Sequence, residues 1–171
     1  GKSTLSKVLA SRIPNARVVP MDGFHRHNDD LEQHGLISRK GAPETFDALG
    51  FLELVKGIRT TKTLEYPTFD RHNDCVVPGG DSLDAADQTI LVEGNYLLLD
   101  ALIWRDLTHQ WDFRIYVDVP ISTLTERLIA RWLENGLERD AAIKRARQND
   151  LLNANLVMQK RPNSDMTAHL D

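Results

Sequence analysis

The chain opens with Gly1-Lys2-Ser3-Thr4, the second half of the pattern G-x-x-x-x-G-K-[ST]. In this pattern, backbone N–H groups and the start of the next helix surround phosphate oxygens, the lysine adds a mobile positive charge, and the following hydroxyl binds Mg²⁺. A helical pattern at residues 3–13 begins directly after the lysine. A plain surface turn before a helix is the alternative. We predict that Gly1, Lys2, Ser3 and Thr4 bind a nucleotide.

Strand-like and helical patterns alternate along the rest of the chain. Strands are expected at residues 17–21, 89–92 and 113–119, and helices at residues 46–58, 122–135 and 140–158. The continuous apolar run at 89–92 is typical of a strand buried on both faces of a sheet. The alternation predicts a doubly wound α/β fold with a mainly parallel sheet, in which ligands bind at the carboxyl ends of the strands.

Two carboxylates close predicted strands. Asp22 follows the first strand, and can accept the proton of a substrate hydroxyl or hold the water shell of a metal. Glu93 follows residues 89–92 and resembles an acid that orients Mg²⁺ between phosphates. The alternatives are a turn-forming Asp-Gly and a capping acid. We predict that Asp22 is catalytic and that Glu93 and Ser3 form the metal site.

Two pairs of arginines follow in the predicted helices. Arg127 and Arg131 are four residues apart, so they project together from one helix, and Arg145 and Arg147 lie in the next. A solvated helix face is the alternative. Two helices joined by a flexible turn can close over phosphates as a lid, and the planar guanidinium binds such oxygens in pairs. We expect this lid at roughly residues 127–147.

The residues between the two acids give weaker signals. The histidines at positions 25, 27 and 34, with Cys75, match no zinc-binding spacing, so a substrate pocket or a plain surface is expected there. Residues 66–72 mix aromatic, acidic and basic side chains, and we interpret them as a loop. This loop either recognises the substrate or is an ordinary polar connection.

Composition limits the class of protein. The 171 residues suit one domain, residues 1–171, and carry 21 basic and 25 acidic side chains for a net charge of −4. Nucleic acid is therefore not an expected partner, because binding it depends on a basic surface. The chain has a single cysteine and lacks an apolar run of roughly 20 residues. We expect a cytoplasmic protein without a membrane partner, and a homodimer is compatible with the sequence.

Taken together, these features resemble the P-loop kinases of the phosphoribulokinase/uridine kinase group, which includes bacterial pantothenate kinase. The resemblance is greatest to a bacterial branch described as nucleoside kinase-like or fructose-transport-associated kinases. It rests on stretches that run in family order through most of the chain: MDGFH at 21–25, RKGAPETFD at 39–47, PTFDR at 67–71, VEGNYLLL at 92–99, and residues 127–136.

The resemblance implies a three-layer P-loop NTPase fold with a helical lid and an ATP-dependent kinase activity. The acceptor would be a hydroxyl of a nucleoside, sugar or pantothenate-like metabolite, with ATP and Mg²⁺ as cofactors. Lys2 and Ser3 would hold the β- and γ-phosphates and Mg²⁺, Asp22 would be the general base, and Glu93 the Walker B acid. Further residues are expected to act in catalysis (Arg127 and Arg131) or to bind the acceptor (Arg39, Lys40, Arg71 and His72).

Other functions stay open at this point. A nucleotide-binding regulator or ATPase would keep Lys2 and Glu93 but would not need Asp22. A GTP-dependent switch is disfavoured, since the sequence lacks an Asn-Lys-x-Asp guanine-reading motif. A non-catalytic interaction protein derived from a kinase would bind no nucleotide with Mg²⁺.

The sequence begins inside the phosphate-binding pattern. In the family, a strand at the centre of the sheet precedes this pattern, and it is missing from the chain. We therefore expect a fragment or truncated gene model of an active kinase, whose own activity is open. The neighbouring strands would expose unpaired edges, which favours instability and aggregation.

Overall fold

The computed structural model describes residues 1–170 of the chain. Its strands form three pairs, and two of these pairs are parallel. The parallel pairs are β1 (Ala16–Pro20) with β4 (Thr89–Glu93), and β5 (Ile115–Asp118) with β6 (Met166–His169). The third pair is an antiparallel hairpin of β2 (Leu64–Asp70) and β3 (Cys75–Leu83). The expected α/β fold with mainly parallel strands is confirmed.

Helices connect and cover these strands. The α-helices are α1 (Lys2–Ala10), α2 (Asn28–Gln33), α3 (Ala48–Gly57), α4 (Ile121–Glu134), α5 (Arg139–Arg145) and α6 (Leu151–Gln159). A π-helical turn, η5 (Ala146–Asp150), joins α5 to α6. Short 3₁₀ segments include η1 (Met21–Phe24), η2 (Ile37–Arg39), η3 (Pro43–Thr45) and η4 (Leu102–His109). The expected helix at 140–158 is therefore real, but a π turn interrupts it.

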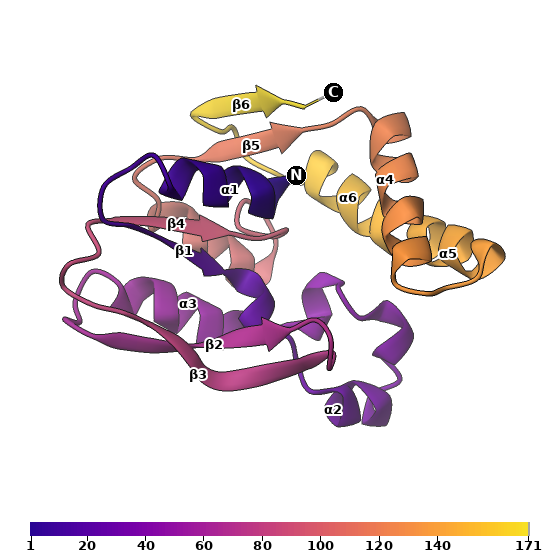
Figure 1. The fold of residues 1–171 in the computed structure, drawn as a ribbon, viewed down its shortest axis with the longest axis horizontal. Helices are drawn as coiled ribbons and strands as arrows, with labels where there is room; N and C mark the ends of the chain where they lie inside the picture. The colour runs from indigo at the N-terminus through magenta and orange to yellow at the C-terminus, as the bar shows by residue number, and fades with distance from the viewer. Residues whose placement is uncertain (171) are drawn as a thin grey trace.

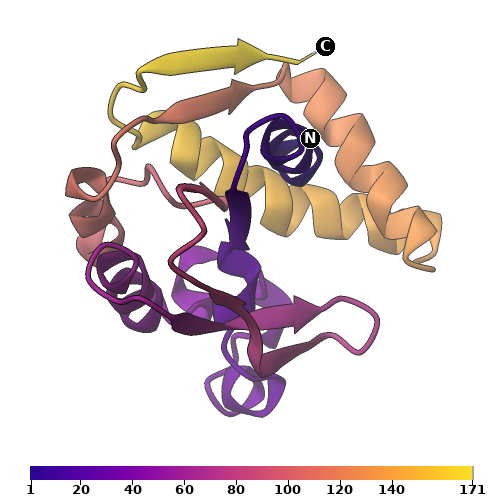
Figure 2. The ribbon, with the colours of Figure 1, turned by 60° about the vertical axis from the view of Figure 1, so that its left-hand side comes forward.

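The elements are stacked in a definite order. In Figure 1, β5 and β6 lie at the top, β1 and β4 in the middle and the β2–β3 hairpin below, while α4 and α5 project to the right. Helix α1 packs against β1 and β4. Figure 2 shows α5 and α6 as an almost continuous helical rod that passes behind α1. The start of α1 thereby faces the space between the strands and the projecting helices.

An aromatic core fixes the segment that follows β1. Met21 and Phe24, on either side of Asp22, are buried, and the rings of Phe24 and Phe51 lie 5.1 Å apart. Phe51 comes from α3, whose buried face also packs on η4. Burial of one such aromatic side chain contributes roughly 1.5–3 kcal/mol. Asp22 is therefore carried by a segment that the core holds on both sides.

The expectation that residues 89–92 are buried on both faces is wrong. All residues of β4 are only partly buried. One edge of β4 pairs with β1, and residues of β4 and β5 together line a cavity of about 600 Å³. Its apolar lining includes Leu5, Ile90, Val92, Ile115 and Val117. The apolar sequence of residues 89–92 correctly indicated apolar surroundings, but it could not predict the cavity beside the strand.

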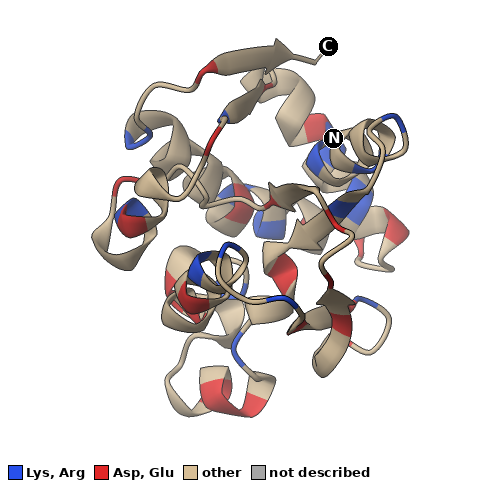
Figure 3. Cartoon of the chain, turned by 90° about the vertical axis from the view of Figure 1, so that its left-hand side faces the viewer, with Lys and Arg blue, Asp and Glu red and all other residues tan. Residues whose placement is uncertain are grey.

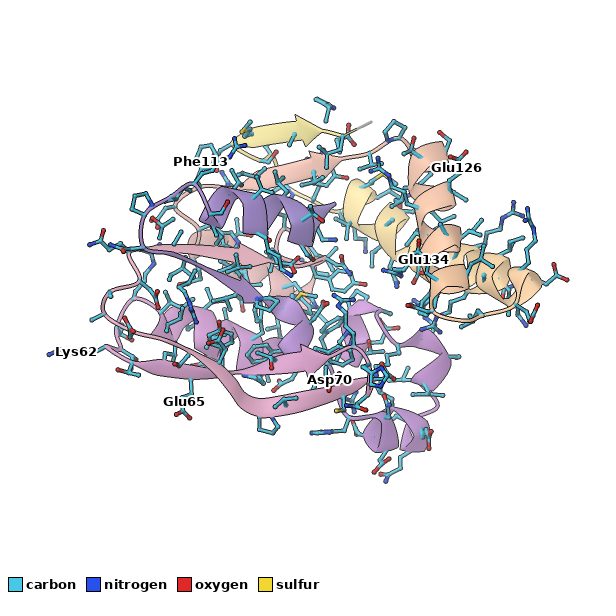
Figure 4. All side chains as sticks on the ribbon, viewed as in Figure 1. Lys62, Glu65, Asp70, Phe113, Glu126 and Glu134 are labelled. Atoms are coloured by element: carbon cyan, nitrogen blue, oxygen red, sulfur yellow. The ribbon has the colours of Figure 1, made fainter. Side chains whose placement is uncertain are left out.

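The interpretation of residues 66–72 as a loop is also wrong. Most of this segment belongs to β2, and Tyr66 is 1% exposed within the core. The hairpin turn begins only after Asp70, which stands at the end of β2 (Figure 4). The Asp70 carboxylate accepts hydrogen bonds from the backbone N–H groups of His72 and Asn73, at 2.9 and 3.1 Å. This side-chain cap makes the polar sequence a tight turn.

Charge is distributed evenly over the fold. Figure 3 shows basic and acidic residues interspersed along the visible ribbon rather than separated onto two faces. Among residues 1–170, no helix is long and apolar enough to cross a bilayer. The same residues contain no cluster of three or more His, Cys, Asp or Glu side chains that could hold a metal by themselves. A metal here would need hydroxyl, water or phosphate ligands as well.

Candidate active site

The start of α1 and the end of β4 meet at one point. The Ser3 hydroxyl donates a hydrogen bond to the Glu93 carboxylate, with Oγ and Oε1 2.9 Å apart. The N-cap of α1 is Gly1, which has no side chain, so the first N–H groups of the helix receive no side-chain cap. Such a helix start attracts anions. The structure thus brings the predicted phosphate-binding residues to the predicted metal-binding acid.

Lys2 lies at the centre of the charges in this region. Its side chain is solvent-accessible, yet it lines the cavity beside β4, and desolvation there lowers the pKa of its ammonium group. Attraction to Glu93 and Asp22 opposes this shift, and repulsion from Arg131 and Arg71 adds to it. Five of the predicted site residues therefore share one electrostatic environment around the start of α1.

Close packing positions Asp22. The adjacent Gly23 lies against β2, and a Cβ atom at this position would stand 1.9 Å from the carbonyl oxygen of Pro67. Only glycine allows η1 to approach β2 so closely. The Asp22 side chain is 24% exposed and forms an ion pair with Arg71, which projects from the β2–β3 turn. The predicted base and one predicted acceptor-binding residue are thus in contact.

His25 is a site residue that sequence reasoning left undecided. Its ring stacks on Phe46 at 4.1 Å between centroids and lies 4.8 Å from the ring of Phe69. Burial lowers the pKa of His25 to about 4, although attraction to Asp22 opposes the shift. Its Nδ1 atom is buried and has no hydrogen-bond partner among the described residues. A neutral imidazole therefore lies three residues after the predicted base, a spacing that could have signalled it.

This low pKa makes stability depend on pH. In the unfolded chain His25 becomes protonated below a pH of about 6.5, whereas in the folded protein it stays neutral down to about pH 4. Protonation therefore favours the unfolded chain, and the unfolding free energy falls as the pH decreases between these values. We expect up to about 2 kcal/mol lower unfolding free energy at pH 5 than at pH 7.5 from this group. Urea unfolding at both pH values should show a smaller difference in His25→Phe, which keeps the ring stacking, than in the wild type.

The control for this measurement is His27→Gln, which replaces an exposed histidine two residues away. Its pH dependence should match that of the wild type. If His25→Phe keeps the full wild-type loss of stability between pH 7.5 and pH 5, the buried neutral state of His25 is wrong.

The predicted lid arginines lie near the start of α1. Arg131 donates to the Asp150 carboxylate at 3.1 Å, and its guanidinium carbon lies 5.1 Å from the ring centroid of Trp132. The Trp132 indole N–H donates to the same carboxylate at 2.6 Å. Arg127 interacts electrostatically with Gly1. Arg131 likewise interacts electrostatically with Lys2, so both arginines of α4, which also carries Glu126 and Glu134 (Figure 4), lie within electrostatic range of the phosphate-binding end.

Two of the other three predicted acceptor-binding residues have side-chain partners in the protein. Arg39 donates to the Asn149 and Asn153 side chains, at 2.7 and 3.2 Å. Lys40 is 11% exposed at its side chain and is paired with Asp74 at 2.8 Å. His72 is exposed on the β2–β3 turn. Of the predicted acceptor residues, only Arg71 thus contacts the predicted base directly.

Arg145 does not face the phosphate-binding end. Its guanidinium donates to the backbone carbonyl oxygens of Ser38 and Lys40, at 2.5 and 2.9 Å. Asn149 is 2% exposed and donates to the same Lys40 carbonyl at 2.9 Å. Sequence reasoning missed Asn149 and its neighbour Asn153, whose four-residue spacing places both on one helix face.

Comparison with known proteins gives the relatives of this chain. No family model matches it. A solved structure described as a "putative fructose transport system kinase" from Silicibacter sp. TM1040 superimposes with a TM-score of 0.94 at 47% identity, covering 98% of this chain and 83% of that one. The "Putative uridine kinase C227.14" of Schizosaccharomyces pombe is 32% identical over 171 residues, which cover 92% of this chain and 73% of the relative.

The chain belongs to the P-loop kinases of the phosphoribulokinase/uridine kinase group. The resemblance seen in the sequence and the expected P-loop NTPase fold are thereby confirmed. The chain is also 38% identical to the uncharacterized protein YggC of Escherichia coli over 148 residues, and this match covers 83% of the chain but 61% of YggC.

Proposed function

We propose that this P-loop kinase transfers the γ-phosphate of ATP to a hydroxyl group of a small metabolite. One observation carries the proposal. The Ser3–Glu93 pair, Lys2 and Asp22 converge where β1 and β4 end, and the uncapped start of α1 faces the same place. A kinase needs a phosphate cradle, a metal site and a base within reach of one another, and in the proposal these residues would supply all three.

The donor set of Ser3 and Glu93 fits Mg²⁺. Both residues offer oxygen atoms, which this hard cation prefers, and the two oxygens already lie 2.9 Å apart. Bound Mg²⁺ would neutralise charge on the phosphates. Ser3 and Glu93 would hold the ion directly or through water, and Lys2 would place its ammonium group on the phosphate oxygens together with the N–H groups that follow Gly1.

Asp22 would act as the general base. Its carboxylate accepts the proton of the acceptor hydroxyl as the hydroxyl oxygen bonds to the γ-phosphorus, and the bond from that phosphorus to the leaving oxygen of ADP breaks. In the structure described here Arg71 is paired with this carboxylate. The ion pair keeps the Asp22 carboxylate oriented.

The arginines of α4 would complete the site. Arg131 lies within electrostatic range of Lys2, and Arg127 within range of Gly1. Their guanidinium groups would neutralise charge on the transferred phosphoryl group and exclude water, as parts of a lid at roughly residues 127–147 within one kinase domain, residues 1–171.

The acceptor would lie next to Asp22 and the neutral ring of His25. The relatives carry names that refer to uridine and to fructose transport, so nucleosides and sugars are the first classes to consider. Arg71 and His72 would contact the acceptor from the β2–β3 turn. Arg39 and Lys40 stay proposed acceptor-region residues, but their protein partners leave them less free to bind it.

Consumption of Mg-ATP tests the proposal. The purified protein is assayed with nucleosides, pantothenate and simple sugars, each added separately, and product ADP is followed by a coupled assay. We expect one acceptor class to stimulate turnover above the rate with ATP alone. A slow ATPase that is indifferent to every acceptor would instead indicate a nucleotide-dependent regulator.

A further inference from the structure

The position of Arg71 depends on the β2–β3 turn. Its side chain is 68% exposed and forms an ion pair with Asp22. Residues 71–74 form the turn, so Arg71 reaches Asp22 only while the turn keeps its place. Asp70 caps the turn internally, but this cap does not tie the turn to the rest of the molecule.

Lys40 supplies that tie. Its Nζ atom lies 2.8 Å from the Asp74 carboxylate, 3.1 Å from the Asp74 carbonyl oxygen and 2.7 Å from the Asn28 side-chain oxygen. Asn28 also donates to the Asp74 carboxylate, at 3.2 Å. The Lys40 ammonium further lies 5.1 Å from the ring centroid of Phe69 in β2. One nearly buried lysine thus joins the far end of the turn to the start of α2.

The backbone of Lys40 is fixed from the opposite side. Its carbonyl oxygen accepts hydrogen bonds from Arg145 and from the buried Asn149, both at 2.9 Å. Arg145 also holds the carbonyl of Ser38, and the Tyr96 hydroxyl donates to the carbonyl of Gly41 at 2.5 Å. Because residues 38–41 are held in this way, the Lys40 side chain extends from a rigid base.

We propose that Lys40 is a positioning residue that holds the β2–β3 turn so that Arg71 meets Asp22. An ammonium group has three N–H donors, and the two oxygens of Asp74 and the one of Asn28 match that number. Direct binding of the acceptor by Lys40 is therefore disfavoured, although Lys40 also lines a cavity of about 230 Å³ with Phe69 and Asn73. The catalytic meaning of this role rests on the proposed kinase function.

Hydrogen exchange tests the positioning without any assay of activity. In Lys40→Met, the amides of His72 and Asn73 should exchange roughly tenfold faster, because a turn no longer tied at Asp74 frays and breaks the hydrogen bonds of the Asp70 cap more often. Amides of β1 and β4 should keep their protection, which shows that the variant is folded. Lys56→Met is the matched control, since within residues 1–170 Lys56 pairs with Glu53 on the surface of α3 and has no ion pair with the turn. Unchanged exchange at His72 and Asn73 in Lys40→Met overturns the proposal.

A double-mutant cycle tests the catalytic consequence, using the acceptor that the turnover screen finds. Lys40→Met and Arg71→Gln should each lower kcat about tenfold or more, and the double variant should be no worse than Arg71→Gln alone. The KM for Mg-ATP should stay unchanged in all three. If the fold losses in kcat of the two single variants multiply in the double variant, Lys40 acts independently of Arg71 and the proposal is overturned. The proposal is also overturned if Lys40→Met raises the KM for the acceptor in the Arg71→Gln background, because Lys40 would then bind the acceptor itself.

The two experiments fail in different ways. If no acceptor stimulates turnover, the proposed function fails, but the exchange measurement still decides whether Lys40 holds the turn. If turnover is found and Lys40→Met has wild-type exchange and kcat, the kinase stands and the positioning role is wrong. Lys40→Arg should recover part of the protection, because a guanidinium group also pairs with Asp74.

Discussion

Replacing Asp22 with asparagine will lower kcat by a factor of about 10²–10⁴ while changing the KM for Mg-ATP little. Asparagine keeps the size of the side chain but cannot take the proton of an acceptor hydroxyl. Asp22 lies at the end of β1 rather than among the uncapped N–H groups of α1, so nucleotide binding should persist. Steady-state kinetics with saturating acceptor give both constants.

The matched control is Asp106→Asn, which replaces an exposed aspartate on η4. It should turn over like the wild type. Since Asp22→Asn also removes the ion pair with Arg71, its melting temperature must be measured beside its kinetics. A folded Asp22→Asn variant with near-normal turnover would refute the assignment of the base.

Lys2→Met will abolish most of the stabilisation that Mg-ATP gives to the folded protein. A ligand at a hundredfold excess over its Kd adds about 2.7 kcal/mol to the unfolding free energy, and this gain disappears when the phosphates lose their main cation. Without nucleotide, the variant should be as stable as the wild type or slightly more so, because desolvation already disfavours the ammonium group of Lys2. Thermal unfolding with and without Mg-ATP measures both effects.

Lys7→Met serves as control, since Lys7 is an exposed lysine on the same helix. It should keep the full Mg-ATP shift. Lys2→Met should reduce the stabilisation by Mg-ATP without lowering the stability of the nucleotide-free protein. This combination distinguishes a binding role of Lys2 from damage to the fold. A Lys2→Met protein that Mg-ATP stabilises as well as the wild type would remove Lys2 from the phosphate site.

The parts of the site that local sequence encodes could be predicted. A glycine-lysine-serine start before a helix, and an acid directly after an apolar strand, are short patterns with a direct physical meaning, and the structure joins them through the Ser3–Glu93 hydrogen bond. Strand β1 with its terminal acid was recognisable for the same reason. These features depend on residues that are neighbours in the chain.

Features that depend on distant pairing could not be predicted. The β2–β3 hairpin was hidden because Pro67 and the charged residues at its turn obscure the alternation of its strand. The contact between Arg39 and Asn149 joins residues 110 positions apart, and no local pattern reports such a pair. The family resemblance placed Arg39 in the acceptor region, whereas in the structure its guanidinium donates to two buried amides, Asn149 and Asn153.

The tryptophan of α4 has a consequence for observing this protein at work. Trp132 donates its indole N–H to Asp150, and the guanidinium groups of Arg131 and Arg145 lie 5.1 and 5.2 Å from its ring. Indole emission is sensitive to nearby charge, and a shift of either arginine alters that charge at once. The other two tryptophans, Trp104 and Trp111, pack in or against the aromatic core. The protein therefore carries its own fluorescent reporter on the helices that we propose to close over the nucleotide.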